Sequence, residues 1–188
     1  MVEPSEQLVS DALAKKDLRA EGFTKPEMRN RKTPDFRVWH GREFAFYCEV
    51  KEVARNDWAE GGRPDPIFNR LTDAIHTAVK QFNSVNADRR DPNVLAFVNN
   101  DRKCGYLDLL AVTTGRFFAA DGSTVPIYEQ FSEGRIRDEK YRVDLYLWFD
   151  SFAPDQLLSN AADPRHLQRL CAYFGVNPDS IEIIGESE

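Results

Sequence analysis

Residues 34–53 read PDFRVWHGREFAFYCEVKEV, and the strands predicted here form the centre of the expected fold. Residues 43–53 carry the clearest strand pattern in the chain, because apolar side chains occur on both of its alternating faces. The two faces are predicted to hold Phe44, Phe46, Cys48 and Val50 on one side and Ala45, Tyr47, Glu49, Lys51 and Val53 on the other. Residues 36–39 alternate as a shorter strand, and His40-Gly41 between the two predicts a tight antiparallel hairpin.

Two acids and a lysine lie at the open end of this hairpin. Asp35 starts the first strand, and Glu49 and Lys51 lie near the end of the second, so antiparallel pairing brings all three together. Glu49 and Lys51 share a face because they are two residues apart. Charged side chains on a strongly apolar strand are unfavourable unless they are paired or bound to a metal. The spacing therefore predicts a small acid–acid–lysine site.

This set suits the chemistry of a metal-dependent phosphodiesterase. Two neighbouring carboxylates bind Mg²⁺, or Mn²⁺ as a substitute, through hard oxygen ligands and leave positions for water and phosphate. We expect Asp35, Glu49 and the backbone carbonyl of Val50 to hold the ion. Lys51 can then orient or deprotonate the attacking water, or neutralise charge on the phosphorus centre.

The pieces of this motif are common in the chain, so their context is what distinguishes one copy from the others. Pro-Asp occurs four times and an acid-x-Lys triplet three times. Only the triplet from Glu49 to Lys51 lies inside a strong strand that follows a strand begun by Pro-Asp. The triplets starting at Asp101 and Asp138 fall after a strand end and in a charge-rich loop.

The residues before the hairpin predict a helix and a weak strand. Apolar residues recur at helical spacing within residues 5–20, with Ser5 as N-cap and Gly22 as the stop. Residues 23–29 are a weak candidate for a strand, which Pro26 would confine to a sheet edge.

The residues after the hairpin predict a crossover connection. Asp65 as N-cap and Pro66 as first residue begin a long helix with a single apolar stripe. The apolar run at residues 93–98 then predicts a strand buried on both faces. Strand, helix and strand in this order predict that residues 93–98 pair in parallel with residues 43–53.

The C-terminal part predicts further elements of the same α/β domain rather than a second domain. These are a helix at 107–113, a hairpin of 117–119 and 124–128 around Asp121-Gly122, a strand at 142–149, and a helix begun by Asp163-Pro164, running to Phe174 and ended at Gly175. We therefore expect one domain over residues 1–188.

Pro34-Asp35 followed by Glu49-Val50-Lys51 resembles the motif of the PD-(D/E)xK nuclease superfamily. The resemblance implies a restriction-endonuclease-like mixed sheet flanked by helices, with residues 1–103 as the nuclease-like core and residues 104–188 as a C-terminal elaboration. It also implies an enzyme in which the acids bind the metal and the lysine assists catalysis.

The resemblance extends to residues on the flanking helices. An acid on the first helix often joins the site in this family, and Glu6 is the best candidate, ahead of Asp11. A Gln or Lys on the helix after the motif sometimes does so as well, which implies Lys80 or Gln81. Val85 stands where many members carry a tyrosine, so the exonuclease type of motif is not supported.

The implied partner is DNA, although nothing in the sequence separates DNA from RNA or a branched nucleic acid. A basic cluster next to the motif is predicted to contact phosphates, and its members are Arg29, Arg31, Lys32 and Arg37. Single-domain nucleases often need two active sites to cut a duplex, so the resemblance also implies a homodimer. Trp58, in a polar stretch, is a candidate for stacking on a base.

Charge, hydropathy and cysteine content narrow the classes of protein to which the chain can belong. The net charge of −6 is uneven, because residues 1–103 hold 18 Lys and Arg against 17 Asp and Glu, whereas residues 104–188 hold 7 against 14. The acidity therefore lies away from the predicted site. No apolar run is long enough to span a bilayer, and the polar start of the chain is unlike a signal peptide. Three scattered cysteines favour reduced, buried thiols and a cytoplasmic protein.

Other interpretations remain open at this stage. Glu49 and Lys51 also fit a charge pair on an exposed strand face, and Asp35 fits a strand entry after proline. The acidic C-terminal part could face a basic protein partner. A non-catalytic binding module that keeps the nuclease-like fold is therefore the alternative to an enzyme.

Overall fold

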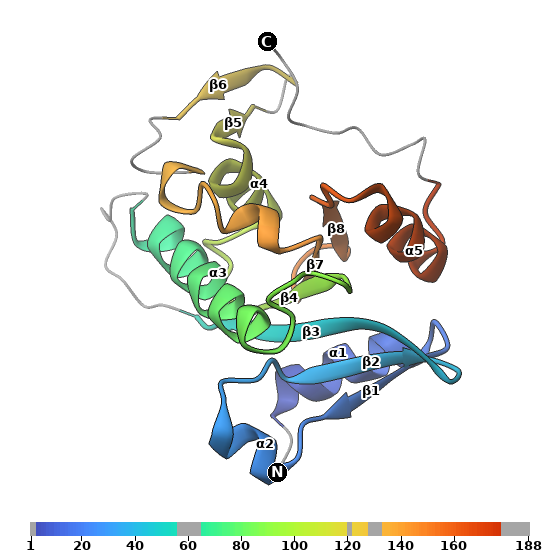
Figure 1. Ribbon diagram of the computed structural model, residues 1–188. Helices are drawn as coiled ribbons and strands as arrows, with labels where there is room; N and C mark the ends of the chain where they lie inside the picture. The colour runs from blue at the N-terminus through green and yellow to red at the C-terminus, as the bar shows by residue number, and fades with distance from the viewer. Residues whose placement is uncertain (1–2, 56–64, 120–121, 128–132, 178–188) are drawn as a thin grey trace.

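A six-stranded mixed sheet forms the centre of the computed structural model, which describes residues 3–55, 65–119, 122–127 and 133–177 (Figure 1). In spatial order the strands are β1 (Leu18–Gly22), β2 (Phe36–His40), β3 (Glu43–Val53), β4 (Asn93–Asn99), β7 (Leu145–Asp150) and β8 (Gln156–Ser159). The helices are α1 (Pro4–Ala14), α2 (Lys25–Asn30), α3 (Asp65–Val85), α4 (Tyr106–Thr114) and α5 (Pro164–Phe174). The expectation of an α/β fold with a mixed sheet flanked by helices is confirmed.

The predicted hairpin and crossover are both present. β2 and β3 pair antiparallel, and β3 matches the predicted residues 43–53. β4 pairs in parallel with β3, and α3 connects the two. All of β4 is buried, because helices cover both faces of the sheet at this strand.

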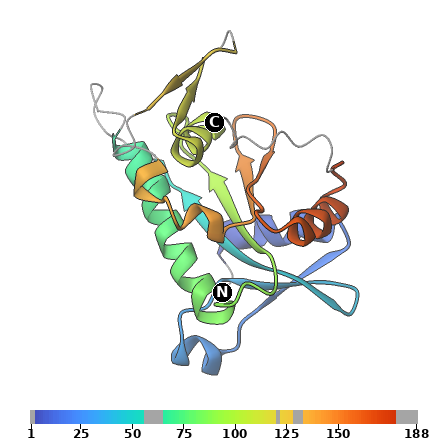
Figure 2. The same cartoon turned by 45° about the horizontal axis from the view of Figure 1, so that its top comes forward.

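Helices lie on both sides of the sheet (Figure 2), and an apolar core fills the space between helices and sheet on each face. On one face α3 and α4 pack against side chains such as Leu95 and Trp148. On the other face α1 and α5 pack against side chains such as Phe46 and Val94. Glu49 and Lys51 alternate with Cys48 and Val50 along β3, so they lie on the face that α3 covers.

A β-bulge in β3 changes which residues lie on each face of the strand, compared with the prediction. Val38 pairs with Phe46, but Trp39 pairs with Phe44, so Ala45 is the extra residue. Ala45 therefore packs with Phe46 in the α1 and α5 core, and Phe44 lies with Tyr47 on the other face. The prediction for these two residues was wrong, whereas the alternation beyond the bulge is as expected.

The N-terminal elements differ from their predictions. The predicted helix over residues 5–20 ends at Ala14, because Asp17 adopts a positive φ of 58° and Leu18 is buried as the first residue of β1. Glu3, not Ser5, is the N-cap. The predicted strand over residues 23–29 is wrong.

The short helix α2 takes the place of the strand predicted over residues 23–29. A capping box between Thr24 and Glu27 starts this helix, and Pro26 lies in its first turn, where the missing N–H is tolerated. The T-x-x-E pattern was therefore a signal in the sequence that favoured a helix here.

The C-terminal residues contribute β7 and β8 to the sheet. The predicted strand at 142–149 begins later, at Leu145, because Lys140–Arg142 forms a 3-10 turn, η3. A second 3-10 turn, η2, spans Glu133–Arg135, and β8 was not predicted. The helices α4 and α5 agree with prediction, and Asp163 caps α5 by accepting a bond from the Arg165 N–H.

A separate hairpin consists of β5 (Arg116–Phe118) and β6 (Thr124–Pro126), in agreement with the predicted turn. Trp58, Pro64, Asp121 and Tyr128 lie outside the described residues. Cys48, Cys104 and Cys171 are buried and unpaired, as expected. In the described part of the chain, no helix has the length and apolar character needed to cross a bilayer.

The turn at Gly41 offers a first test of the hairpin. Gly41 has a φ of +59°, which an L side chain adopts only with strain, so Gly41→Ala should lower the free energy of unfolding by about 1 kcal/mol. Gly22→Ala is the matched control, because its new methyl group would meet only the Asp35 carbonyl at 3.9 Å. Urea unfolding of both variants measures the difference, and equal stabilities would contradict the expected strain.

Candidate functional site

The hairpin brings Asp35, Glu49 and Lys51 into direct contact. The Asp35 N–H donates to Glu49 Oε2 at 3.1 Å, and the Val50 N–H donates to Asp35 Oδ2 at 2.8 Å. Lys51 Nζ donates to Glu49 Oε1 at 2.5 Å. The pairing of Phe36 with Cys48 sets this arrangement, because the next rung of the ladder places Asp35 opposite Glu49.

Burial and mutual repulsion make the two carboxylates hard to ionise together. Glu49 is only 1% exposed, and burial, followed by the nearby Asp35 carboxylate, raises its pKa to about 7. Burial also raises the pKa of Asp35, although the bond from the Val50 N–H and the charge of Lys51 act in the opposite direction. A further positive charge at this point would relieve the repulsion.

Gln81 on α3 connects the lysine to the segment before β2. Lys51 Nζ donates to Gln81 Oε1 at 3.5 Å, and Gln81 Nε2 donates to the Thr33 carbonyl at 2.9 Å. Lys80, the other candidate on this helix, is exposed to solvent. Of the two residues, the structure therefore brings Gln81 to the site.

Two glutamates of the α1 segment lie near the carboxylate pair. Burial is the main cause that raises the pKa of Glu6, and the negative charge of Asp35 adds to it. Glu3 was not predicted, yet its charge contributes to the raised pKa of Asp35. Glu3 and Glu6 form the capping box of α1, and this spacing was the signal that could have linked them.

The predicted basic residues have different surroundings. Arg31 is exposed and donates to the Ser84 carbonyl at 3.3 Å, and Lys32 beside it is also exposed. Arg37 pairs with Glu27 and lies 4.0 Å from the centre of the Phe23 ring, so it holds α2 against the sheet. Arg31 and Lys32 are thus available to a ligand, whereas Arg37 is engaged within the fold.

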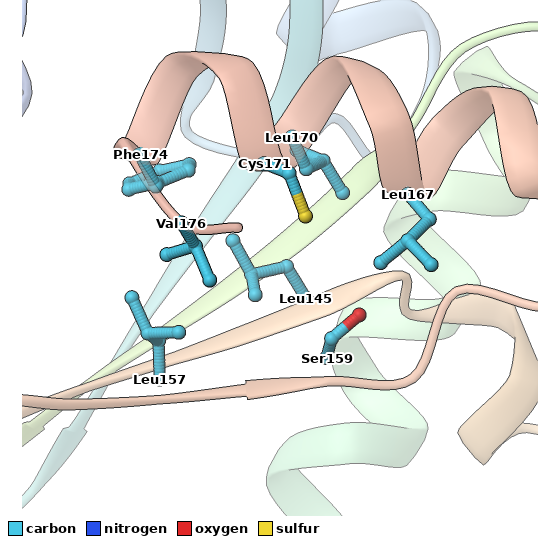
Figure 3. Close-up of a pocket in the computed structure, with 8 residues that line it drawn as sticks. All are labelled: Leu145, Leu157, Ser159, Leu167, Leu170, Cys171, Phe174 and Val176. Carbon is cyan, nitrogen blue, oxygen red and sulfur yellow. The ribbon is translucent and has the colours of Figure 1, made fainter. Parts of the chain in front are cut away.

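Other polar groups and hollows lie apart from this site. His166 is buried against Asp144, and His76 pairs with Glu139. Within the described ranges, no three His, Cys, Asp or Glu side chains are grouped as a metal site. A small apolar hollow lies between α5 and β7–β8, on the face opposite Lys51 (Figure 3). Its lining residues are Leu145, Leu157, Ser159, Leu167, Leu170, Cys171, Phe174 and Val176.

Comparison of the chain with protein-family models, with curated proteins and with solved structures finds no match. The chemical capacity of Asp35, Glu49 and Lys51 is therefore inferred from their own geometry and from the resemblance of their motif.

Proposed function

We propose that this chain is a metal-dependent nuclease whose active centre is formed by Asp35, Glu49 and Lys51. One observation carries the proposal: two partly or fully buried carboxylates face each other across a hairpin, with a lysine ammonium at 2.5 Å from one of them. A charge pair that served only stability would not need a second carboxylate that raises the pKa of the first.

The donor set fits a hard divalent cation. Asp35 and Glu49 supply carboxylate oxygens, the ligands that Mg²⁺ and Mn²⁺ prefer. The Val50 N–H points at Asp35 Oδ2, and in a strand the carbonyl of the same residue points the same way. Asp35, Glu49 and the Val50 carbonyl would therefore hold the ion, which supplies Lewis-acid activation of phosphate and water when bound.

The remaining residues have roles that follow from their contacts. Lys51 can orient the attacking water or neutralise charge that develops on the phosphate. Gln81 is held by its bond to the Thr33 carbonyl and accepts a bond from the Lys51 ammonium, so it positions that ammonium. Glu6 is near enough to Asp35 for the Asp35 charge to raise the pKa of Glu6, so Glu6 can orient a water molecule at the carboxylate pair. Arg31, Lys32 and Lys80 are exposed and can bind phosphates, whereas Arg37 contributes by holding α2.

The order of elements supports the same proposal. Apart from the short helix α2 between β1 and β2, the order helix α1, strands β1 to β3, helix α3 and strand β4 is the one that the PD-(D/E)xK resemblance implies. We propose DNA as the substrate, with RNA or a branched nucleic acid as alternatives. A homodimer would supply two active sites for a duplex, and the reduced cysteines are consistent with a cytoplasmic protein.

Calorimetry with Mn²⁺ tests the metal site directly. We expect one site per chain in the wild type, and no detectable binding in Asp35→Asn or Glu49→Gln, because each variant removes one of two charged ligands. Glu52→Gln is the matched control, since Glu52 lies on the same strand but bonds to Asn100. Binding that persists in both site variants would contradict the proposal.

A non-catalytic binding module is the second candidate. The observation that favours it is that the site is satisfied by its own bonds: Glu49 accepts from Lys51 and from the Asp35 N–H, and Asp35 accepts from the Val50 N–H. Absence of a Mn²⁺ site that depends on Asp35 and Glu49 would favour this candidate over the nuclease.

A further inference from the structure

The bulge in β3 sets the register that brings the two carboxylates together. His40 pairs with Glu43 in the first rung after the turn. An uninterrupted ladder from that rung would place Asp35 opposite Cys48. The extra residue of the bulge shifts every later rung by one position, so Asp35 lies opposite Glu49 instead.

Without this shift the two carboxylates would lie on different faces of the sheet. Cys48 is buried in the core under α1 and α5, whereas Glu49 lies on the face that α3 covers. Residues directly opposite each other in an antiparallel pair share a face, so Asp35 opposite Cys48 would point its carboxylate into an apolar core. The bonds from the Asp35 N–H to Glu49 and from the Val50 N–H to Asp35 therefore depend on the bulge.

Arg169 of α5 bonds directly to the bulge. Its Nη2 donates to the Phe44 carbonyl at 2.9 Å and to the Ala45 carbonyl at 3.0 Å. Successive carbonyls of a regular strand point to opposite edges, so one nitrogen can reach two of them only where the strand is irregular. Asp91 accepts a bond from Arg169 Nη1 at 3.4 Å and orients the guanidinium. The arginine is thus matched to the bulged form of β3 and not to a regular strand.

The bulge lies where β3 lacks one of its two neighbouring strands. β4 pairs with β3 from Tyr47 onward, so among the described strands only β2 runs beside the bulge. The guanidinium supplies donors at this edge, and bonds from a charged donor are stronger than bonds between neutral groups. Ala45 and Arg169 are 124 residues apart in the sequence. A local feature of β3 is therefore stabilised by the C-terminal part of the chain.

We propose that Arg169 is a positioning residue of the carboxylate pair, because by fixing the bulge it keeps β2 and β3 in the register that places Asp35 opposite Glu49. The consequence for metal binding rests on the proposed function, whereas the register does not. Arg169 bonds to the bulge and to Asp91 rather than to the two site carboxylates, so it acts on the site through the register.

Deleting Ala45 separates this role from general stability. The deletion removes the bulge but keeps the rung of Asp35 and Glu49, because the ladder from the turn then has no extra residue. With Ala45 present, Arg169→Met should weaken Mn²⁺ binding about tenfold or more, the effect of losing bonds from a charged donor. In the chain without Ala45, the same substitution should change Mn²⁺ affinity by less than about twofold. Calorimetry of the four proteins measures the difference.

Hydrogen exchange in EDTA tests the register without a metal ion. The Val50 N–H donates to Asp35, so its exchange should be about tenfold faster in Arg169→Met. Exchange of the Leu95 N–H in the centre of β4 should change much less. A general loss of stability would not separate the two amides.

Arg165→Met is the matched control for both measurements. Arg165 belongs to the same helix but is exposed and pairs with Asp163, the N-cap of α5. Its replacement should leave Mn²⁺ affinity and the exchange of the Val50 N–H unchanged, because Arg165 makes no bond to the bulge among those of the described residues.

Three results would overturn the inference. The first is an equal loss of Mn²⁺ affinity in Arg169→Met with and without Ala45. The second is exchange of the Val50 N–H that follows exchange of the Leu95 N–H in folded Arg169→Met. If Arg169→Met does not fold, deletion of Ala45 should restore folding, and an unfolded double variant is the third result. If the wild type binds no Mn²⁺ but its Val50 exchange responds as expected, the inference on the register stands and the nuclease proposal fails.

Discussion

Replacing Lys51 with methionine is expected to lower metal-dependent cleavage of DNA by about 10²–10⁴-fold, the range that a positioned proton-transfer group contributes. Asp35→Asn should lower it by about a thousandfold or more, since a lost metal ligand removes several kcal/mol of transition-state stabilisation. Gel assays with Mg²⁺ or Mn²⁺, on single-stranded and duplex substrates, measure both effects. Circular dichroism checks that each variant is folded.

The matched control for cleavage is a change of charge outside the site. Lys15→Met removes an exposed lysine at the C-terminal end of α1 and should leave the rate within about twofold, because exposed charges distant from the reaction act weakly through solvent. If folded Lys51→Met and folded Asp35→Asn both cleave DNA robustly, these residues are not the active centre.

Metal-free wild-type protein is expected to lose stability as pH rises from about 5 to 8, and Glu49→Gln is expected to remove most of that loss. The pKa of Glu49 is raised to about 7 in the folded chain, from an ordinary value of 4.5. Between these two values the folded state keeps a proton that the unfolded state releases, so the free energy of unfolding falls as pH rises. Above pH 7 the free energy of unfolding is expected to be lower by about 3 kcal/mol than at low pH.

Urea unfolding in EDTA at several pH values measures this slope. Near pH 8, Glu49→Gln should be more stable than the wild type, because an amide avoids burying a carboxylate charge. Glu52→Gln is the control, since Glu52 is exposed and bonds to Asn100, and it should leave the slope unchanged. A flat wild-type profile between pH 5 and 8 would show that the fold does not raise the pKa of Glu49.

Local sequence patterns predict the hairpin and the pairing of its acids. Alternation over residues 43–53, Gly41 at the turn and Pro34-Asp35 at the strand entry are local signals, and they act over only a few residues. The order strand, helix and strand in the sequence also predicts the crossover to β4, because two neighbouring parallel strands need such a connection. These local features are enough to predict that Asp35 lies close to Glu49.

The surroundings of that pair depend on contacts between segments that are far apart in the sequence. The choice of Gln81 over Lys80 depends on the angle at which α3 crosses β3, and adjacent helix residues point about 100° apart, so one residue decides which side chain meets Lys51. The bulge at Ala45 depends on the register between two strands and turned Phe44 to the open face. Arg37 was assigned to phosphates by its charge, but its packing against Phe23 and Glu27 follows from the position of α2. Short-range patterns fix which strands carry the chemistry, whereas contacts between distant segments fix which side chains complete it.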